Sequence, residues 1–262
     1  MVTHGEPARR QLIERGRGLA VVLLHGFPLD GRIWEDQVEG LSDAYRVIVP
    51  DLPGFGRSGS SNCATLRDHA AALHALLEAA GALPCVLGGL SMGGYIALAF
   101  ARLYPNDLKG LMFVDTKASA DDTTARAGRE KMIATVRADG SKAIAEAMLP
   151  KMLTAHTIAA DPSLTMRVRA IMESQSGTTI EIALRALRDR PDHTDFLPSI
   201  AVPTLVVVGD SDPIISIAVA QAMSDAIPKS TLAVIKGSSH LSSMEQPAQV
   251  TLAMRRFLDG VV

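Results

Sequence analysis

The chain alternates short apolar runs with longer stretches in which apolar residues recur at helical spacing. The first of these runs lie at 19–24, 46–50, 84–89 and 108–115. Each is continuously apolar and lacks the period-two alternation of a half-exposed strand. Such runs are typical of strands buried on both faces of a parallel sheet. They therefore predict a central sheet that is covered on both sides.

The segments between these runs predict helices. Within 64–80 the leucines and one alanine fall on a single helical face, and 91–104 is rich in alanine and leucine until Pro105 ends it. Strands that alternate with helices indicate an α/β fold class, with a mostly parallel central sheet flanked by helices.

The alternation stops after Asp115 and resumes near residue 203. Residues 117–197 show only helical stretches, interrupted by glycine or proline at Gly128, Gly140, Pro150, Pro162 and Gly177. Further strands are then predicted at 203–210 and 231–236, and further helices at about 215–227 and 245–259. The pattern predicts a core domain of residues 1–116 and 198–262. It also predicts a helical cap (lid) domain, 117–197, over the carboxyl edge of the sheet.

The sequence Gly89-Leu90-Ser91-Met92-Gly93 lies where a predicted strand meets a predicted helix. In that context G-x-S-x-G indicates a nucleophile elbow, a tight turn in which neighbouring Cβ atoms would clash with the serine. Gly94 gives further room for close helix–strand packing. The turn exposes the Ser91 hydroxyl at a helix N-terminus, where developing negative charge is favoured. We predict Ser91 as a catalytic nucleophile.

A serine hydroxyl needs a base to accept its proton, and the chain has seven histidines. His240 lies in a loop directly after the last predicted strand, at the sheet edge toward which the elbow points. It is therefore predicted as the general base. His25 follows the first strand and is expected to brace its loop. The remaining histidines fall at the N-terminus, in the helix before the elbow, or in the cap: His4, His69, His74, His156 and His193.

The base needs an acceptor on its other ring nitrogen. The segment GDSDP after the strand at 203–210 offers Asp210 and Asp212. Asp212 is preferred because it lies farther into the loop and can turn toward His240. Asp210 is expected to shape the turn through local hydrogen bonds. Asp115, at the end of another strand, is a third candidate.

The oxyanion of a tetrahedral intermediate requires preorganised donors. The backbone N–H groups of Met92 and Phe27 are predicted to supply them, and Gly26 lets the backbone approach. Apolar and aromatic side chains are predicted to line the pocket: Phe27, Trp34, Tyr95, Met132, Met148, Met152 and Met172. For the methionines, internal packing is an equally good interpretation.

Four motifs in order give the chain a family resemblance: HGFP (25–28), DLPGFGRS (51–58), GLSMGGY (89–95) and the GDSDP/SSH pair (209–213 and 238–240). The chain resembles the α/β-hydrolase superfamily along nearly its whole length. Within that superfamily it is similar to small carboxylesterases, 3-oxoadipate enol-lactonases and cofactor-free haloperoxidases (perhydrolases). The resemblance implies the α/β-hydrolase fold, with the cap inserted after the sixth strand. It also implies that Asp51 and the segment 54–59 brace a loop beside the site. Relatives usually begin with an antiparallel hairpin, for which residues 1–18 barely suffice.

The leading functional interpretation is hydrolysis of a carboxylic ester of small to medium acyl size through an acyl-enzyme, without metal or organic cofactor. Enol-lactonase and perhydrolase activities are the nearest alternatives. Carbon–carbon bond hydrolases, hydroxynitrile lyases and acyltransferases share the same triad. Dehalogenases and epoxide hydrolases of this fold use an aspartate nucleophile, so Ser91 argues against them. A weakly catalytic ligand receptor is a remote alternative.

Composition adds limits on partners and location. The formal net charge is −2, and no basic stretch combines with aromatics, so no nucleic acid is expected as a partner. No apolar run is long enough to span a bilayer, and residues 1–11 do not have the pattern of a signal peptide. Two cysteines, Cys63 and Cys85, are too few for a disulfide framework. We therefore expect a cytoplasmic monomer or homodimer that acts on a small-molecule ester or lactone.

Overall fold

A seven-stranded sheet organises the computed structural model, which describes residues 12–59 and 63–261. The strand order is β1-β3-β2-β4-β5-β6-β7, with β1 antiparallel to β3 and the other pairs parallel. The predicted fold class is confirmed, and each predicted strand lies within one residue of its expected bounds. The strands are β1 (Leu12–Arg15), β2 (Ala20–Leu24), β3 (Arg46–Pro50), β4 (Cys85–Leu90), β5 (Leu108–Val114), β6 (Thr204–Gly209) and β7 (Ser230–Ile235).

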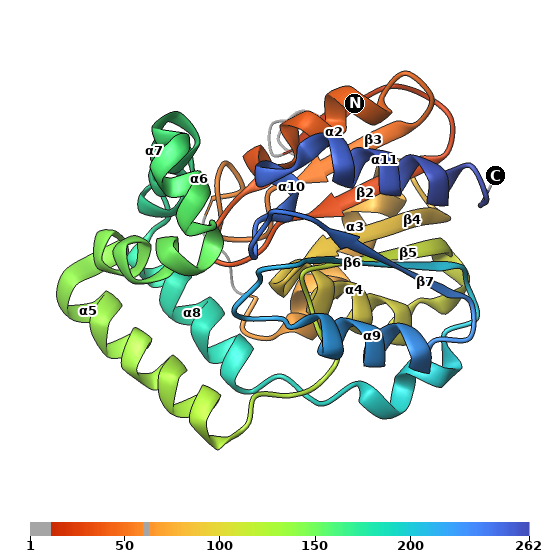
Figure 1. The fold of residues 1–262 in the computed structure, drawn as a ribbon. Helices are drawn as coiled ribbons and strands as arrows, with labels where there is room; N and C mark the ends of the chain where they lie inside the picture. The colour runs from red at the N-terminus through yellow and green to blue at the C-terminus, as the bar shows by residue number, and fades with distance from the viewer. Residues whose placement is uncertain (1–11, 60–62, 262) are drawn as a thin grey trace, which may run out of the picture.

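Helices cover both faces of this sheet, as Figure 1 shows. One face carries α2 (Glu35–Leu41) and α11 (Pro247–Leu258), and the other carries α3 (Leu66–Ala79), α4 (Met92–Leu103) and α9 (Ile217–Ala226). The sequence pattern did not predict α2 or the 3-10 turn η1 (Gly31–Trp34) before it. Both are too short for helical periodicity to stand out. Three other short helical segments are η2 (Pro105–Asp107), η3 (Thr194–Ser199) and α10 (Ser242–Glu245).

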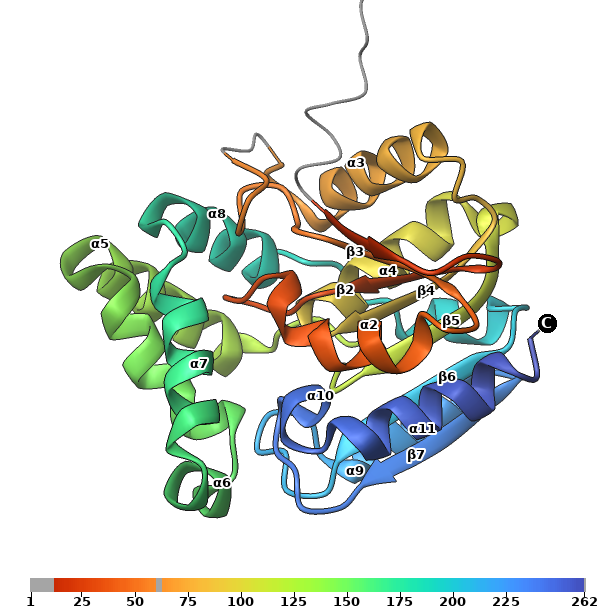
Figure 2. The ribbon, with the colours of Figure 1, turned by 90° about the horizontal axis from the view of Figure 1, so that it is seen from above.

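Four further helices follow one another between β5 and β6 and pack at one end of the sheet (Figures 1 and 2). They are α5 (Thr123–Met152), α6 (Ala155–Ala160), α7 (Pro162–Glu173) and α8 (Gly177–Arg188). β5 is the fifth strand of the described part of the chain. A hairpin partner before β1 would fall within residues 1–11, outside the described residues, so insertion after a sixth strand stays a prediction.

The expected interruptions at Gly128 and Pro150 are wrong, because α5 continues through both residues. A glycine inside a helix costs only about 1 kcal/mol relative to alanine. Pro150 lies in the last turn, where it removes one i→i−4 hydrogen bond at the end of the helix and does not divide the helix. Gly140 does break the helix, with φ 74° and ψ −168°. Pro162 and Gly177 each occupy the first position of a helix, as expected for segment boundaries.

The two ends of the helical insertion are hydrogen-bonded to each other. The His193 N–H donates to the Ala118 carbonyl at 3.0 Å. The Ala120 N–H donates to Asp192 Oδ2, also at 3.0 Å. The insertion therefore leaves the core and returns to it at one place.

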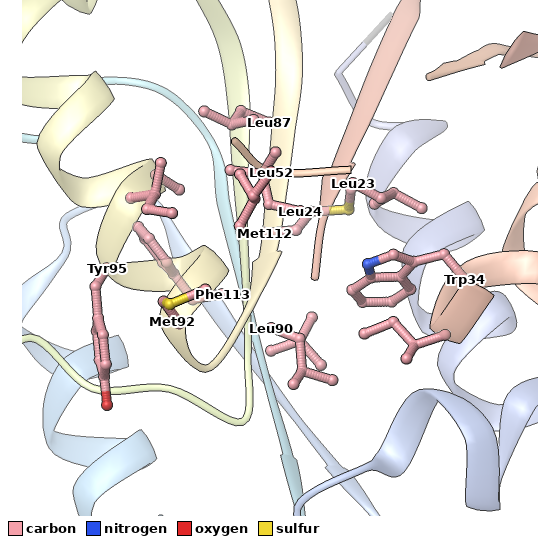
Figure 3. Packing of buried hydrophobic residues seen from close by; sticks show 14 of the residues in the cluster. Leu23, Leu24, Trp34, Leu52, Leu87, Leu90, Met92, Tyr95, Met112 and Phe113 are labelled. Carbon is pink, nitrogen blue, oxygen red and sulfur yellow. The ribbon is translucent and has the colours of Figure 1, made fainter. Parts of the chain in front are cut away.

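Apolar side chains from the strands and the covering helices form one continuous core, part of which Figure 3 shows. Cys85 is buried in it as a free thiol, and burial raises the pKa of Cys85 to about 12. Cys63 is also free of any disulfide. Among the described residues, every helix is too short or too polar to cross a bilayer.

Candidate active site

Ser91 joins β4 to α4 through a strained turn. Its φ of 51° and ψ of −111° are rare for a residue with a side chain. Glycine neighbours make the turn possible. A Cβ on Gly89 would lie 2.2 Å from the Gly93 carbonyl, and one on Gly93 would lie 2.5 Å from the Leu24 oxygen. The turn geometry predicted from the G-x-S-x-G motif is therefore present.

The residues after β5 hold the turn from the other side. The Ser91 N–H donates to the Val114 carbonyl at 2.9 Å. The Thr116 hydroxyl donates to the Ser91 carbonyl at 2.8 Å. The Ser91 side chain is left partly exposed, and its hydroxyl has no hydrogen-bond partner among the described residues. That hydroxyl is available to a substrate.

His240 and Asp212 form a buried pair. Nδ1 of His240 lies 2.8 Å from Asp212 Oδ2, and the two side chains are 2% and 0% exposed. The other carboxylate oxygen of Asp212 accepts from the N–H groups of Ile214 (2.7 Å) and Ile215 (3.0 Å). Because a carboxylate oxygen accepts hydrogen bonds, the ring proton of His240 lies on Nδ1 and Nε2 is able to accept a proton.

The structure does not join Ser91 to His240 by a hydrogen bond. Both residues lie at the carboxyl edge of the sheet, and the end of β5 is bonded to Ser91 and to the segment just after His240. The Val114 carbonyl accepts from the Ser91 N–H, and Asp115 Oδ2 accepts from the Ser242 hydroxyl at 2.6 Å. Hydrogen bonds between a nucleophile and its base are often long without substrate. The absence of this hydrogen bond is therefore compatible with proton transfer once a substrate is bound.

The two alternative acids have other partners. Asp210 is exposed, and its Oδ1 accepts from the Ser211 hydroxyl and from the Gly237 N–H, both at 3.0 Å. It shapes the turn, as expected. Asp115 is fully buried at a positive φ of 47° and accepts from the Gly209 N–H at 2.9 Å as well as from Ser242. The geometry therefore favours Asp212 as the partner of the histidine.

Asp115 is unusual among the carboxyl groups near the site. Burial raises its pKa to about 7, although the nearby His240 lowers it in part. Its two oxygens link β6 to the loop that carries His240. The sequence suggested Asp115 only as a third candidate acid, and its bracing contacts depend on strands that are distant in the sequence.

The loop after β2 lies against the elbow. A Cβ on Gly26 would lie 3.3 Å from the Ser91 Cβ, so this glycine permits the close approach. His25 braces the loop as predicted. Its Nδ1 pairs with the Gly26 carbonyl at 2.9 Å, its Nε2 accepts from the Leu52 N–H at 3.0 Å, and burial lowers its pKa. The N–H groups of Phe27 and Met92 have no acceptor among the described residues.

Asp51 fastens the same loop to the segment that follows β3. Its Oδ1 accepts from the Gly31 N–H at 2.9 Å, and its Oδ2 accepts from the Arg57 N–H at 2.9 Å and Nε at 2.8 Å. The bracing role that the family resemblance implied for Asp51 is confirmed. The glycines at 54, 56 and 59 all have positive φ, as a tight loop requires.

Gln175, between α7 and α8, ties the helical insertion to both of these loops. Its Nε2 donates to Asp30 Oδ2, and its Oε1 accepts from the Gly56 N–H, each at 3.0 Å. Burial pushes the pKa of Asp30 upward, but hydrogen bonds and charge from Arg32 outweigh it and lower the pKa overall. Sequence reasoning missed Gln175, because no motif marks a polar residue whose partners lie over a hundred positions away.

The predicted pocket residues are mostly buried. Trp34 is 0% exposed and packs in the core, so its assignment to the pocket wall stays a prediction. In Figure 3, Leu90 lies between Trp34 and Tyr95. The other predicted wall residues range from half-buried to fully buried: Met132 is intermediate, Phe27 and Tyr95 are 4% exposed, Met148 8%, Met152 1% and Met172 0%.

Met152 has a further contact at the site. Its carbonyl accepts from the Leu241 N–H at 2.9 Å, which places the end of α5 beside the loop of His240.

The other histidines lie elsewhere. His69 and His74 are in α3, His156 in α6 and His193 before η3, whereas His4 lies outside the described residues. In the described part of the chain, no cluster of three or more His, Cys, Asp or Glu residues could hold a metal ion.

Comparison with known proteins places this geometry in a family. The profile of the alpha/beta hydrolase fold matches residues 20–247, which is most of the chain. The chain belongs to the α/β-hydrolase family.

Individual relatives of this α/β-hydrolase include esterases. A thermophilic esterase from Thermogutta terrifontis is 42% identical, with a TM-score of 0.92 over 95% of this chain and 93% of that one. The pimeloyl-[acyl-carrier protein] methyl ester esterase of Vibrio campbellii is 26% identical over 92% of this chain and 95% of its own length. The enol-lactonase of Burkholderia xenovorans shares the fold, with a TM-score of 0.88 at 23% identity over 95% of both chains. The group suggested by the sequence motifs is confirmed.

We expect Asp212→Asn to lower kcat by about a thousandfold or more, because an amide favours the wrong histidine tautomer. Asp210→Asn removes only turn contacts and should change kcat by less than about threefold. Steady-state ester hydrolysis by both variants measures the difference. The reverse ranking would reassign the acid to Asp210.

Gln175→Met is expected to lower kcat/KM about tenfold or more, since the loop of Phe27 loses its link through Asp30. Thr178→Ala is the matched control, because Thr178 is an exposed residue at the start of α8 whose side chain makes no hydrogen bond in the described part of the chain. Kinetics and thermal unfolding of both variants separate positioning from stability. Equal activity of the two would show that Gln175 does not position the loop.

The raised pKa of Asp115 gives stability a dependence on pH. Its contribution to the free energy of unfolding is fully present below about pH 4 and is lost as the pH rises through about 7. Asp115→Asn lacks this contribution. We therefore expect the Tm of the wild type, relative to Asp115→Asn, to fall between about pH 4 and pH 8. Parallel Tm curves over that range would argue against the raised pKa.

Proposed function

We propose that this α/β-hydrolase is a serine carboxylesterase that cleaves esters of small to medium acyl size. The observation that carries the proposal is the buried His240–Asp212 pair, at the same sheet edge as the strained Ser91. Similarity to the Thermogutta terrifontis esterase supports an ester as substrate. We extend the proposal to residues 117–197 as a cap domain over the site, because Gln175 and Met152 contact the loops around it.

In this mechanism Ser91 Oγ attacks the ester carbonyl while His240 Nε2 takes the hydroxyl proton. Asp212 remains ionised and stabilises the imidazolium through Nδ1. The tetrahedral intermediate expels the alkoxide, which receives that proton from His240 and leaves as the alcohol. A water molecule, deprotonated by the same histidine, then attacks the acyl-enzyme. This attack forms a second tetrahedral intermediate. Its collapse releases the carboxylic acid, and His240 returns the proton to Ser91 Oγ.

The unpaired N–H groups of Phe27 and Met92 would stabilise the oxyanion in both steps. Their value lies in preorganisation, because His25, Asp51 and Asp30 already fix the loop of Phe27 before substrate binds. Removal of one donor from such a site typically costs about a hundredfold to a thousandfold in kcat.

Lactones are the nearest alternative substrates. A lactone is an internal ester, so its hydrolysis needs the same nucleophile, base, acid and oxyanion donors. Perhydrolysis would differ only in the nucleophile that attacks the acyl-enzyme, with hydrogen peroxide in place of water. The chemistry of the triad is common to all three reactions. The shape of the acyl pocket would therefore decide between them.

Turnover of p-nitrophenyl esters from acetate to dodecanoate, with 3-oxoadipate enol-lactone alongside, tests the proposal. We expect short-chain esters to be hydrolysed fastest and lactone turnover to be weak. Ser91→Ala should retain less than about a thousandth of the wild-type rate and an unchanged Tm. Higher residual turnover would remove Ser91 as nucleophile. Dominant lactone turnover would replace the esterase assignment.

A further inference from the structure

A cavity of about 710 Å³ opens on the flank of the molecule, away from Ser91. It lies between the start of α3, the second half of α4 and the chain that leaves α8. Ala99, the first α4 residue in its wall, is about 12 Å beyond Ser91 at the usual helical rise of about 1.5 Å per residue. Its volume is within the range of small-molecule sites, about 300–1,000 Å³. Apolar side chains form much of its wall: Leu66, Ala99, Leu103, Ala186 and Pro191.

Two arginines in this wall have no acidic partner among the described residues. They are Arg67, in the first turn of α3, and Arg102, near the end of α4. The guanidinium carbon of Arg102 lies 5.4 Å from the centroid of the Phe196 ring. Both side chains are exposed and free to turn toward a ligand.

The other charged residues of the wall are already engaged. Arg185 pairs with Glu181, which lies outside the cavity wall. The carboxylate of Asp189 pairs with Arg188, and that of Asp192 accepts from backbone N–H groups. Arg67 and Arg102 are therefore the wall arginines that no acidic side chain of the described residues pairs with, while the Asp192 carboxylate lies in the same wall without a cationic partner.

Two deeper groups of the wall also have unused hydrogen-bonding capacity. Arg190 and His193 are 3% and 8% exposed, and Nδ1 of the histidine has no partner among the described residues. The Arg190 guanidinium also leaves Nε without a partner, but it pairs with Asp121 at 2.7 Å. Burial, with the charge of Arg102 adding to it, lowers the pKa of His193. The N–H groups of Leu66 and Arg67, at the start of α3, likewise have no acceptor in that part of the chain.

We propose that this flank cavity binds an organic anion with an apolar body, such as a medium-chain carboxylate or alkyl phosphate. The anionic group would lie at Arg67, Arg102 and the start of α3, where helix dipole and guanidinium charge act together. The alkyl chain would cover Leu103 and Ala186.

Calorimetric titration with octanoate tests this site, because it needs no turnover and so stands apart from the esterase proposal. We expect saturable binding of one octanoate per chain. Arg67→Met and Arg102→Met should each weaken it about tenfold or more, as loss of a charge-assisted contact implies. Neutral octanamide should bind at least about tenfold more weakly than octanoate, and octyl phosphate should bind the same site.

Arg17→Met is the matched control, since Arg17 is an exposed arginine in the turn after β1 and outside the cavity wall. It should leave the affinity unchanged, and Tm values should show that all three variants fold. Octanoate binding that survives Arg67→Met and Arg102→Met would place the anion elsewhere and overturn the proposal. Absence of saturable binding to the wild type would overturn it as well.

Discussion

The close approach of three backbone segments around Ser91 is the constraint on which the rest of the site depends. The elbow, the end of β2 and the chain after β5 meet so tightly that a Cβ on Gly93 would strike the Leu24 carbonyl, and one on Gly94 would strike Thr116. A backbone conformation like that of Ser91 costs about 1–3 kcal/mol and persists only where the surroundings enforce it. Here the sheet register and the helix packing hold Ser91 in this conformation. The fold itself therefore determines where the Ser91 hydroxyl is exposed.

Buried carboxylates fix the loops that surround the elbow. Asp30, Asp51, Asp115 and Asp212 each accept at least one backbone N–H from a loop at the same sheet edge. Charge-assisted hydrogen bonds of this kind are shorter and stronger than neutral ones. These loops are therefore held in place before a substrate binds.

Much of this architecture could be predicted from the sequence, because buried parallel strands and the elbow have strong local patterns. Chain order and topology were enough to bring Asp212 and His240 together. Gln175 could not be found, since its partners are set by how the helical insertion docks. The flank cavity is equally a product of tertiary packing.

The hydrogen bonds between Ala118 and His193, and between Ala120 and Asp192, give the insertion a common root on the core. Because the two ends of the insertion lie next to each other, a change in its length does not move β5 and β6 apart. Changes in the length of the helices between these residues can therefore leave the carboxyl edge of the sheet in place, provided that the contacts of Gln175 and Met152 are kept. Under the proposed function, substrate preference can therefore change in the insertion while the catalytic residues of the core stay the same.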